Sequence, residues 1–155
     1  MKKVAVLGSG AWGTTLGQVM CDSGQQVLIW GRNKKVVREI NRRNSNRKFL
    51  KGIDLPPQLK ATTDIKAALE FAEVILLAIP AQTLRENLES WNKIIGDSIK
   101  LKFVIYLKCP ENIMVERVLK RGETSGRADD NKETVVKRIR VFNEQSLPVI
   151  KYYKN

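Results

Sequence analysis

The sequence predicts a doubly wound, three-layer α/β fold, with helices covering both faces of a sheet of five parallel strands. Short apolar runs alternate with helical patterns along the whole chain, which is typical of βαβ units. A glycine-rich turn, residues 8–13, follows the first apolar run and opens the first helical pattern. Because crossovers between parallel strands are right-handed, we expect the strand order 3-2-1-4-5.

The strands are assigned from β-branched and apolar runs, and the helices from apolar residues at helical spacing. Asp64 is expected to cap one helix. The run 73–80 is nearly all apolar, as for a strand covered on both faces. Strands are predicted at residues 4–8, 26–31, 60–63, 73–80 and 102–108. Helices are predicted at residues 11–24, within 32–51, at 65–72, 82–95, 111–122 and 131–153, the last kinked at Pro148. Residues 44–58 are expected to form a loop punctuated by Gly52, Pro56 and Pro57, and 123–130 another loop.

Length and composition favour one soluble domain over residues 1–155. Cys21 and Cys109 are too few for a disulfide or metal framework, so we expect a reducing, cytoplasmic setting and no metal. No apolar run reaches 18 residues, so no membrane partner is expected.

The net charge of +12 is densest in residues 32–51, where nine basic residues stand against Glu39. Such a cluster can bind nucleic acid, but here it lacks interleaved aromatic residues. Val36, Val37 and Ile40 give it an apolar helical stripe. We therefore favour a solvated helix face and the loop after it, and nucleic-acid binding is the less favoured alternative.

The glycines of "VAVLGSGAWGTTL" fit two phosphate-binding patterns. Gly8, Gly10 and Gly13 form the G-x-G-x-x-G fingerprint of Rossmann-like dinucleotide-binding folds, in which the pyrophosphate lies on the start of a helix. The same run also fits a nucleotide-kinase loop, except that Thr14 stands where the phosphate-binding lysine is needed. The strand before and the strand after favour the dinucleotide loop.

The end of the second strand predicts which cofactor is preferred. Sites for NAD(H) place an acidic residue there to hold the ribose 2′-hydroxyl, whereas an arginine accommodates the 2′-phosphate of NADP(H). This chain has "WGRN", with Arg32 and no acid. NADP(H) is therefore favoured over NAD(H), unless Arg32 is only a surface cation.

The segments "VLGSGAWGTTL", "VLIWGRN", "FLKGIDLPPQLKATTDIKAAL" and "VILLAIPAQTLR" resemble the amino-terminal domain of NAD(P)-dependent glycerol-3-phosphate dehydrogenase, across residues 1 to about 99. The resemblance implies hydride transfer between a nicotinamide and dihydroxyacetone phosphate or glycerol 3-phosphate. It places the acid/base lysine and most substrate contacts in a helical carboxy-terminal domain. Together, the fingerprint and the resemblance predict these cofactor-binding residues: Gly8, Ser9, Gly10, Ala11, Trp12, Gly13, Arg32 and Pro80.

Residues 101–155, with the run "LKRGETSGRADDN", resemble the carboxy-terminal part of the UMP-CMP and adenylate kinases. The resemblance implies lid arginines at Arg121, Arg127 and Arg138. The kinase lysine and nucleoside-monophosphate domain are missing, so we interpret the three arginines as vestigial.

These two resemblances lead to one functional hypothesis. The chain is expected to be an engineered chimera, with a dehydrogenase-like half (1–99) and a kinase-like fragment (100–155). It would bind NADP(H) weakly as its small-molecule partner, need no cofactor to fold, and have no catalytic residues and no turnover. The alternative is residual glycerol-3-phosphate dehydrogenase or nucleoside monophosphate kinase activity.

Overall fold

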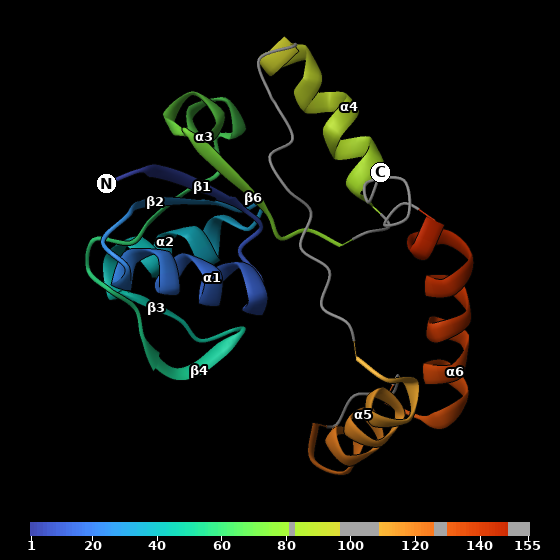
Figure 1. The fold of residues 1–155 in the computed structure, drawn as a ribbon. Helices are drawn as coiled ribbons and strands as arrows, with labels where there is room; N and C mark the ends of the chain where they lie inside the picture. The colour runs from blue at the N-terminus through green and yellow to red at the C-terminus, as the bar shows by residue number, and fades with distance from the viewer. Residues whose placement is uncertain (81–82, 97–108, 126–129, 149–155) are drawn as a thin grey trace. The chain divides into compact units, whose positions relative to one another are not determined.

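The computed structural model describes residues 1–80, 83–96, 109–125 and 130–148 (Figure 1). It divides into two compact units, Met1–Ile99 and Lys100–Asn155. The organisation of the chain as one domain stays a prediction.

The first unit is built on a four-stranded parallel sheet. Its strands, in spatial order, are β5 (Lys60–Thr62), β2 (Gln26–Trp30), β1 (Lys3–Leu7) and β6 (Val74–Leu77). This order matches the first four strands of the predicted 3-2-1-4-5 arrangement. The predicted fifth strand, residues 102–108, lies outside the described residues.

Helices cover both faces of this sheet, which confirms the predicted α/β fold class (Figure 1). Helices α1 (Ala11–Asp22) and α2 (Lys34–Arg43) lie on one side, and α3 (Ile65–Phe71) lies on the other. A further helix, α4 (Leu84–Ile95), contacts α3. Asp64 caps α3 as predicted, because its Oδ1 accepts a hydrogen bond of 3.2 Å from the backbone N–H of Ala67.

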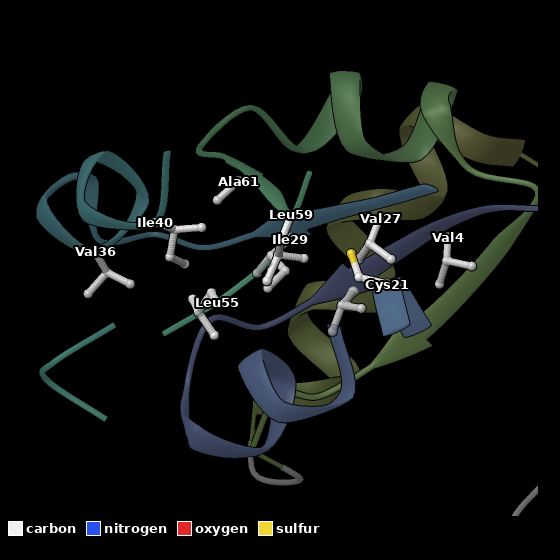
Figure 2. Close-up of a cluster of buried hydrophobic side chains, with 10 residues drawn as sticks. Val4, Cys21, Val27, Ile29, Val36, Ile40, Leu55, Leu59 and Ala61 are labelled. Carbon is white, nitrogen blue, oxygen red and sulfur yellow. The ribbon is translucent and has the colours of Figure 1, made fainter. Parts of the chain in front are cut away.

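Alternation along β1 divides the core into two clusters. Val4 and Val6 belong to the cluster that contains buried residues of α1 and α2, whereas Ala5 and Leu7 belong to the cluster that contains buried residues of α3. Figure 2 shows the first cluster, which also contains Cys21; burial, reinforced by Asp22, raises the pKa of its thiol. In the second cluster the rings of Trp30 and Trp91 meet edge to face, with centroids 5.4 Å apart.

Helix α2 has the apolar stripe that its sequence predicts. Val36 and Ile40 are buried, and all nine basic side chains of residues 32–51 are exposed. Glu39 is half-buried, where its carboxylate accepts hydrogen bonds from Ser45 Oγ (3.1 Å) and from the N–H of Arg47 (3.0 Å).

Two expectations for the first unit are wrong. Residues 44–58 are not all loop, because β3 (Ser45–Asn46) and β4 (Leu50–Asp54) pair as an antiparallel hairpin. Most residues of this hairpin are polar, and its pairing register is irregular. Its sequence therefore lacks the apolar alternation by which strands are predicted. Strand β6 is also less covered than its apolar sequence suggests. Val74 is 40% exposed and Leu77 is 47% exposed, since β6 forms an edge of the described sheet.

The second unit contains three described helical segments: α5 (Glu111–Ser125), α6 (Lys132–Val141) and the π-helical η3 (Phe142–Ser146). Helix α5 continues three residues beyond its predicted end at Gly122, and residues 126–129 of the predicted loop lie outside the described part. Asn131 caps α6 through a 2.9 Å hydrogen bond from the N–H of Thr134. No helix in the described part of either unit is long and apolar enough to cross a membrane.

Candidate dinucleotide-binding site

The glycine turn joins the carboxyl end of β1 to the start of α1. Gly8 has a φ of 134°, which is strained for any residue with a side chain. Its N–H donates to the carbonyl of Trp30 (2.9 Å), and a Cβ on Gly8 would overlap the carbonyl oxygen of Ala78. This glycine therefore allows the turn to pack between the ends of β2 and β6.

The other two glycines of the fingerprint have different surroundings. A Cβ on Gly13 would overlap the carbonyl oxygen of Gly8, so Gly13 allows helix α1 to approach the turn. A Cβ on Gly10 would meet no atom of the described structure within 4 Å. Gly10 therefore borders open space, as expected for the position at which a pyrophosphate approaches the backbone.

The start of α1 is suited to an anion. Gly10 is its N-cap residue and offers no side-chain acceptor to the first N–H groups. The first turn contains no acidic residue. Free N–H groups and the helix dipole both favour a negative charge there.

A cavity of about 710 Å³ opens beside this helix start. Four segments of the first unit line it: the glycine turn, the end of β2, the β3–β4 hairpin and the residues that follow β6. All eight predicted cofactor-binding residues are among its lining residues: Gly8, Ser9, Gly10, Ala11, Trp12, Gly13, Arg32 and Pro80. The structure thus brings together residues from three separate parts of the sequence.

The charged side chains of the cavity are cationic. Arg32 and Lys48 line it, and no Asp or Glu is found among its described lining residues. Arg32 immediately follows β2, and Asn33 fixes the turn there by accepting a 2.9 Å hydrogen bond from the N–H of Lys35 at the start of α2.

The sequence patterns do not predict two of the lining residues, Lys48 and Phe49. Both belong to the hairpin that was predicted to be a loop, and the Nζ of Lys48 lies 5.3 Å from the centroid of the Phe49 ring. Phe49 is 42% exposed, and Trp12, in the first turn of α1, is 73% exposed. Phe49 is the single aromatic residue of the basic cluster 32–51, too few to form an interleaved pattern, and its presence there is the available sequence signal.

Thr14 occupies the position that a kinase loop would give to lysine. Its side chain is fully buried, and its Oγ1 donates to the carbonyl of Gly10 (2.8 Å). It also accepts a 2.8 Å hydrogen bond from Nδ2 of Asn46 in β3. Thr14 therefore ties the glycine turn to the body of the unit.

Two of the three predicted lid arginines, Arg121 and Arg138, lie within the described residues, in α5 and α6. Nε of Arg121 donates to Oδ2 of Asp130 (2.8 Å), and Arg138 lies in the last turn of α6 with an exposed side chain. Arg127 lies outside the described residues. Their assignment to a lid stays a prediction.

Comparison with known proteins gives a consistent family. The family model of the NAD-dependent glycerol-3-phosphate dehydrogenase N-terminus matches residues 3–121. Curated relatives include the glycerol-3-phosphate dehydrogenases (NAD(P)+) of Corynebacterium urealyticum, 47% identical over 93 residues, and Thermobifida fusca, 47% identical over 94. Each match covers 60% of this chain and 28% of the relative, so the chain spans less than a third of their length.

Solved structures agree with this result. A glycerol-3-phosphate dehydrogenase from Coxiella burnetii matches with a TM-score of 0.59 and 31% identity, over 64% of this chain and 30% of that one. The enzyme from Saccharomyces cerevisiae matches with a TM-score of 0.55 and 31% identity, over 59% of this chain and 30% of that one.

These matches overturn the chimera hypothesis. The family model passes through residues 99–102, where a change of family was expected, and continues to residue 121. The interpretation as an engineered chimera without turnover is therefore wrong, since the matched relatives are glycerol-3-phosphate dehydrogenases. Nothing in these matches supports a kinase segment in residues 100–155.

Proposed function

The chain belongs to the family of the NAD-dependent glycerol-3-phosphate dehydrogenase N-terminus, and on this premise we propose that its first 99 residues bind a nicotinamide dinucleotide, with NADP(H) preferred. The observation that carries the proposal is the cavity at the glycine turn, which all eight predicted residues line. The bound cofactor serves the transfer of a hydride between its nicotinamide and dihydroxyacetone phosphate or glycerol 3-phosphate.

The arrangement of the cavity supports a particular orientation of the cofactor. The pyrophosphate lies at the start of α1, beside Gly10, where N–H groups and open space coincide. The adenosine half then reaches the end of β2 and Arg32, and the nicotinamide half lies toward Pro80 after β6.

The preference for NADP(H) follows from charge. The 2′-phosphate of NADP(H) adds two negative charges that Arg32 can pair with, and Lys48 contributes a second cation to the same cavity. A carboxylate that would hold the 2′-hydroxyl of NAD(H) is absent from the described lining residues.

Titration of the protein with NADPH and with NADH, followed by calorimetry, tests this proposal. We expect NADPH to bind more tightly than NADH. We expect Arg32→Gln to weaken NADPH binding by roughly ten- to a hundredfold, the value of a charge-assisted hydrogen bond, with little effect on NADH.

Arg38→Gln is the matched control. Arg38 is an exposed residue of α2 that does not line the cavity, so its replacement removes the same charge from the protein without touching the site. Equal affinity of the unaltered protein for NADPH and NADH would overturn the preference. The absence of saturable binding of either cofactor would overturn the proposal itself.

A further inference from the structure

Asn46 connects the β3–β4 hairpin to the glycine turn. It lies in the two-residue strand β3, and its side chain is fully buried. Its Nδ2 donates to the carbonyl of Ser9 (3.1 Å) and to Oγ1 of Thr14 (2.8 Å). One amide group therefore holds both the turn and the first part of α1, more than thirty residues earlier in the chain.

Both of these contacts require a hydrogen-bond donor at position 46. The carbonyl of Ser9 can only accept. The hydroxyl of Thr14 uses its single proton on the carbonyl of Gly10 (2.8 Å), so toward Asn46 it too must accept. An amide NH₂ supplies two donors at this spacing, which a carboxylate of the same shape cannot do.

The carbonyl oxygen of the Asn46 amide indicates that the residue stands here for its two N–H donors. Oδ1 of Asn46 is buried and has no hydrogen-bond partner in the described structure. A buried carbonyl without a partner is destabilising, and an apolar side chain would avoid this cost. The arrangement therefore favours a role for Asn46 in holding the turn over a role in packing alone.

We propose that Asn46 is a positioning residue for the dinucleotide: it holds the Ser9 and Gly10 backbone in the conformation that receives the pyrophosphate. This inference rests on the proposed function of the cavity. The hairpin that carries Asn46 also carries Lys48 and Phe49, which line the same cavity. The amide thus fixes the hairpin side of the cavity to its glycine side.

The test is Asn46→Asp in the full chain, which keeps the shape of the side chain and replaces the two donors by an acceptor. We expect the dissociation constant for NADPH to rise by about tenfold or more, because the turn loses its tether. In ¹H–¹⁵N NMR spectra we expect the amide signals of Ser9, Gly10 and Thr14 to shift in the absence of cofactor.

Asn41→Asp is the matched control. Asn41 also uses its amide to join two elements, because its Nδ2 donates to the carbonyl of Ala61 (2.8 Å), and neither residue lines the cavity. We expect this variant to lose stability toward denaturant while it keeps its affinity for NADPH and the amide signals of the turn. A purely structural role for Asn46 would instead make the two variants behave alike.

A second variant covers the case in which Asn46→Asp does not fold. Thr14→Val removes the hydroxyl acceptor at nearly constant volume and leaves the contact from Asn46 to Ser9. We expect a smaller rise in the dissociation constant and shifts confined to Gly10 and Thr14.

Unchanged NADPH affinity and unchanged turn signals in the folded variants would overturn the proposal. If the unaltered protein binds no NADPH, the proposed function fails, while the amide signals still decide whether Asn46 holds the turn.

Discussion

At the scale of single residues, the three glycines of the turn have different structural roles. A side chain at Gly8 or Gly13 would overlap backbone oxygen atoms, whereas one at Gly10 would enter open space. Gly10 also has a φ of −75°, which any residue can adopt. The fold therefore requires the first and third glycines, whereas the second is required only by the proposed binding of a pyrophosphate.

This difference predicts opposite effects of two small substitutions. Gly10→Ser places a good N-cap residue at the start of α1, so we expect the free energy of unfolding to stay constant or rise by a few tenths of a kcal/mol. Its hydroxyl would occupy the N–H groups and the space needed by the pyrophosphate. We therefore expect at least about a tenfold weaker affinity for NADPH in calorimetry.

Gly13→Ala is the counterpart of this variant. Its methyl group would overlap the carbonyl of Gly8, so we expect a loss of roughly 1–3 kcal/mol in urea denaturation, as for other overpacked sites. Preserved stability in Gly13→Ala, or preserved NADPH affinity in Gly10→Ser, would contradict this division of roles.

The sequence predicts the glycine turn but not the residues that hold it. The spacing of Gly8, Gly10 and Gly13 is local, and the same spacing recurs in Rossmann-like folds that bind the pyrophosphate of a dinucleotide. The contact between Thr14 and Asn46 joins residues 32 positions apart in the sequence. Such a pairing depends on the path of the intervening chain, which no local pattern describes.

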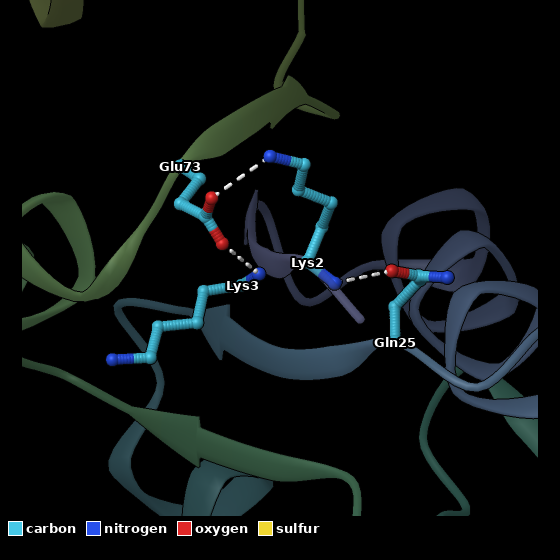
Figure 3. Close-up of polar contacts among 4 residues, drawn as sticks. All are labelled: Lys2, Lys3, Gln25 and Glu73. Carbon is cyan, nitrogen blue, oxygen red and sulfur yellow. Dashed lines mark hydrogen bonds and ion pairs between the residues drawn. The ribbon is translucent and has the colours of Figure 1, made fainter.

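At the scale of the elements, a carboxylate joins the amino ends of β1 and β6. Glu73, one residue before β6, accepts hydrogen bonds from the backbone N–H of Lys3 (3.0 Å) and from Nζ of Lys2 (3.0 Å) (Figure 3). The N–H of Lys2 donates in turn to Oε1 of Gln25, next to the start of β2. The amino ends of three strands are thereby connected.

These contacts predict a pH dependence of stability. The hydrogen bond from Lys3, and then that from Lys2, lower the pKa of Glu73 in the folded protein. A lowered pKa means that the stabilisation is complete above the unfolded-state pKa, about 4.3, and is lost as the pH falls through the folded-state value. We expect Glu73→Gln to be less stable than the unaltered protein at pH 6, with the difference shrinking toward pH 3.

Urea denaturation at pH 6, 4 and 3 measures this difference. Glu70→Gln is the control, because Glu70 forms an exposed ion pair with Lys66 at 3.7 Å within α3, and such pairs contribute little to stability. A constant difference between Glu73→Gln and the unaltered protein across this range would show that the carboxylate does not stabilise the strand ends.

The same elements show how far patterns along the chain can predict a fold. The parallel strands and α1 to α3 appear where apolar spacing and capping residues place them, because each must bury one face. The β3–β4 hairpin was not predicted, since three of the five residues of β4 are polar or glycine and all but Leu50 are exposed. It therefore left two lining residues of the cavity, Lys48 and Phe49, without a prediction.

At the scale of the whole molecule, the described core belongs to the first unit. Both hydrophobic clusters lie between Val4 and Trp91. Among the described residues beyond 99, Val135 is the buried apolar residue. The cavity also takes its described lining residues from the first unit, between Gly8 and Pro80. Fold and proposed site therefore share one region of the chain.

A shortened chain of residues 1–99 tests whether this region is sufficient. Because both clusters and the described cavity lining lie within it, we expect this fragment to unfold cooperatively in urea. We expect its NADPH affinity to lie within about threefold of that of the full chain, which is a smaller difference in binding free energy than a typical hydrogen bond contributes. Gel filtration provides the control, because an exposed edge at β6, with Val74 and Leu77 partly uncovered, can cause association. A non-cooperative or aggregated fragment would instead mean that residues beyond 99 complete the sheet, as a single domain with a fifth strand requires.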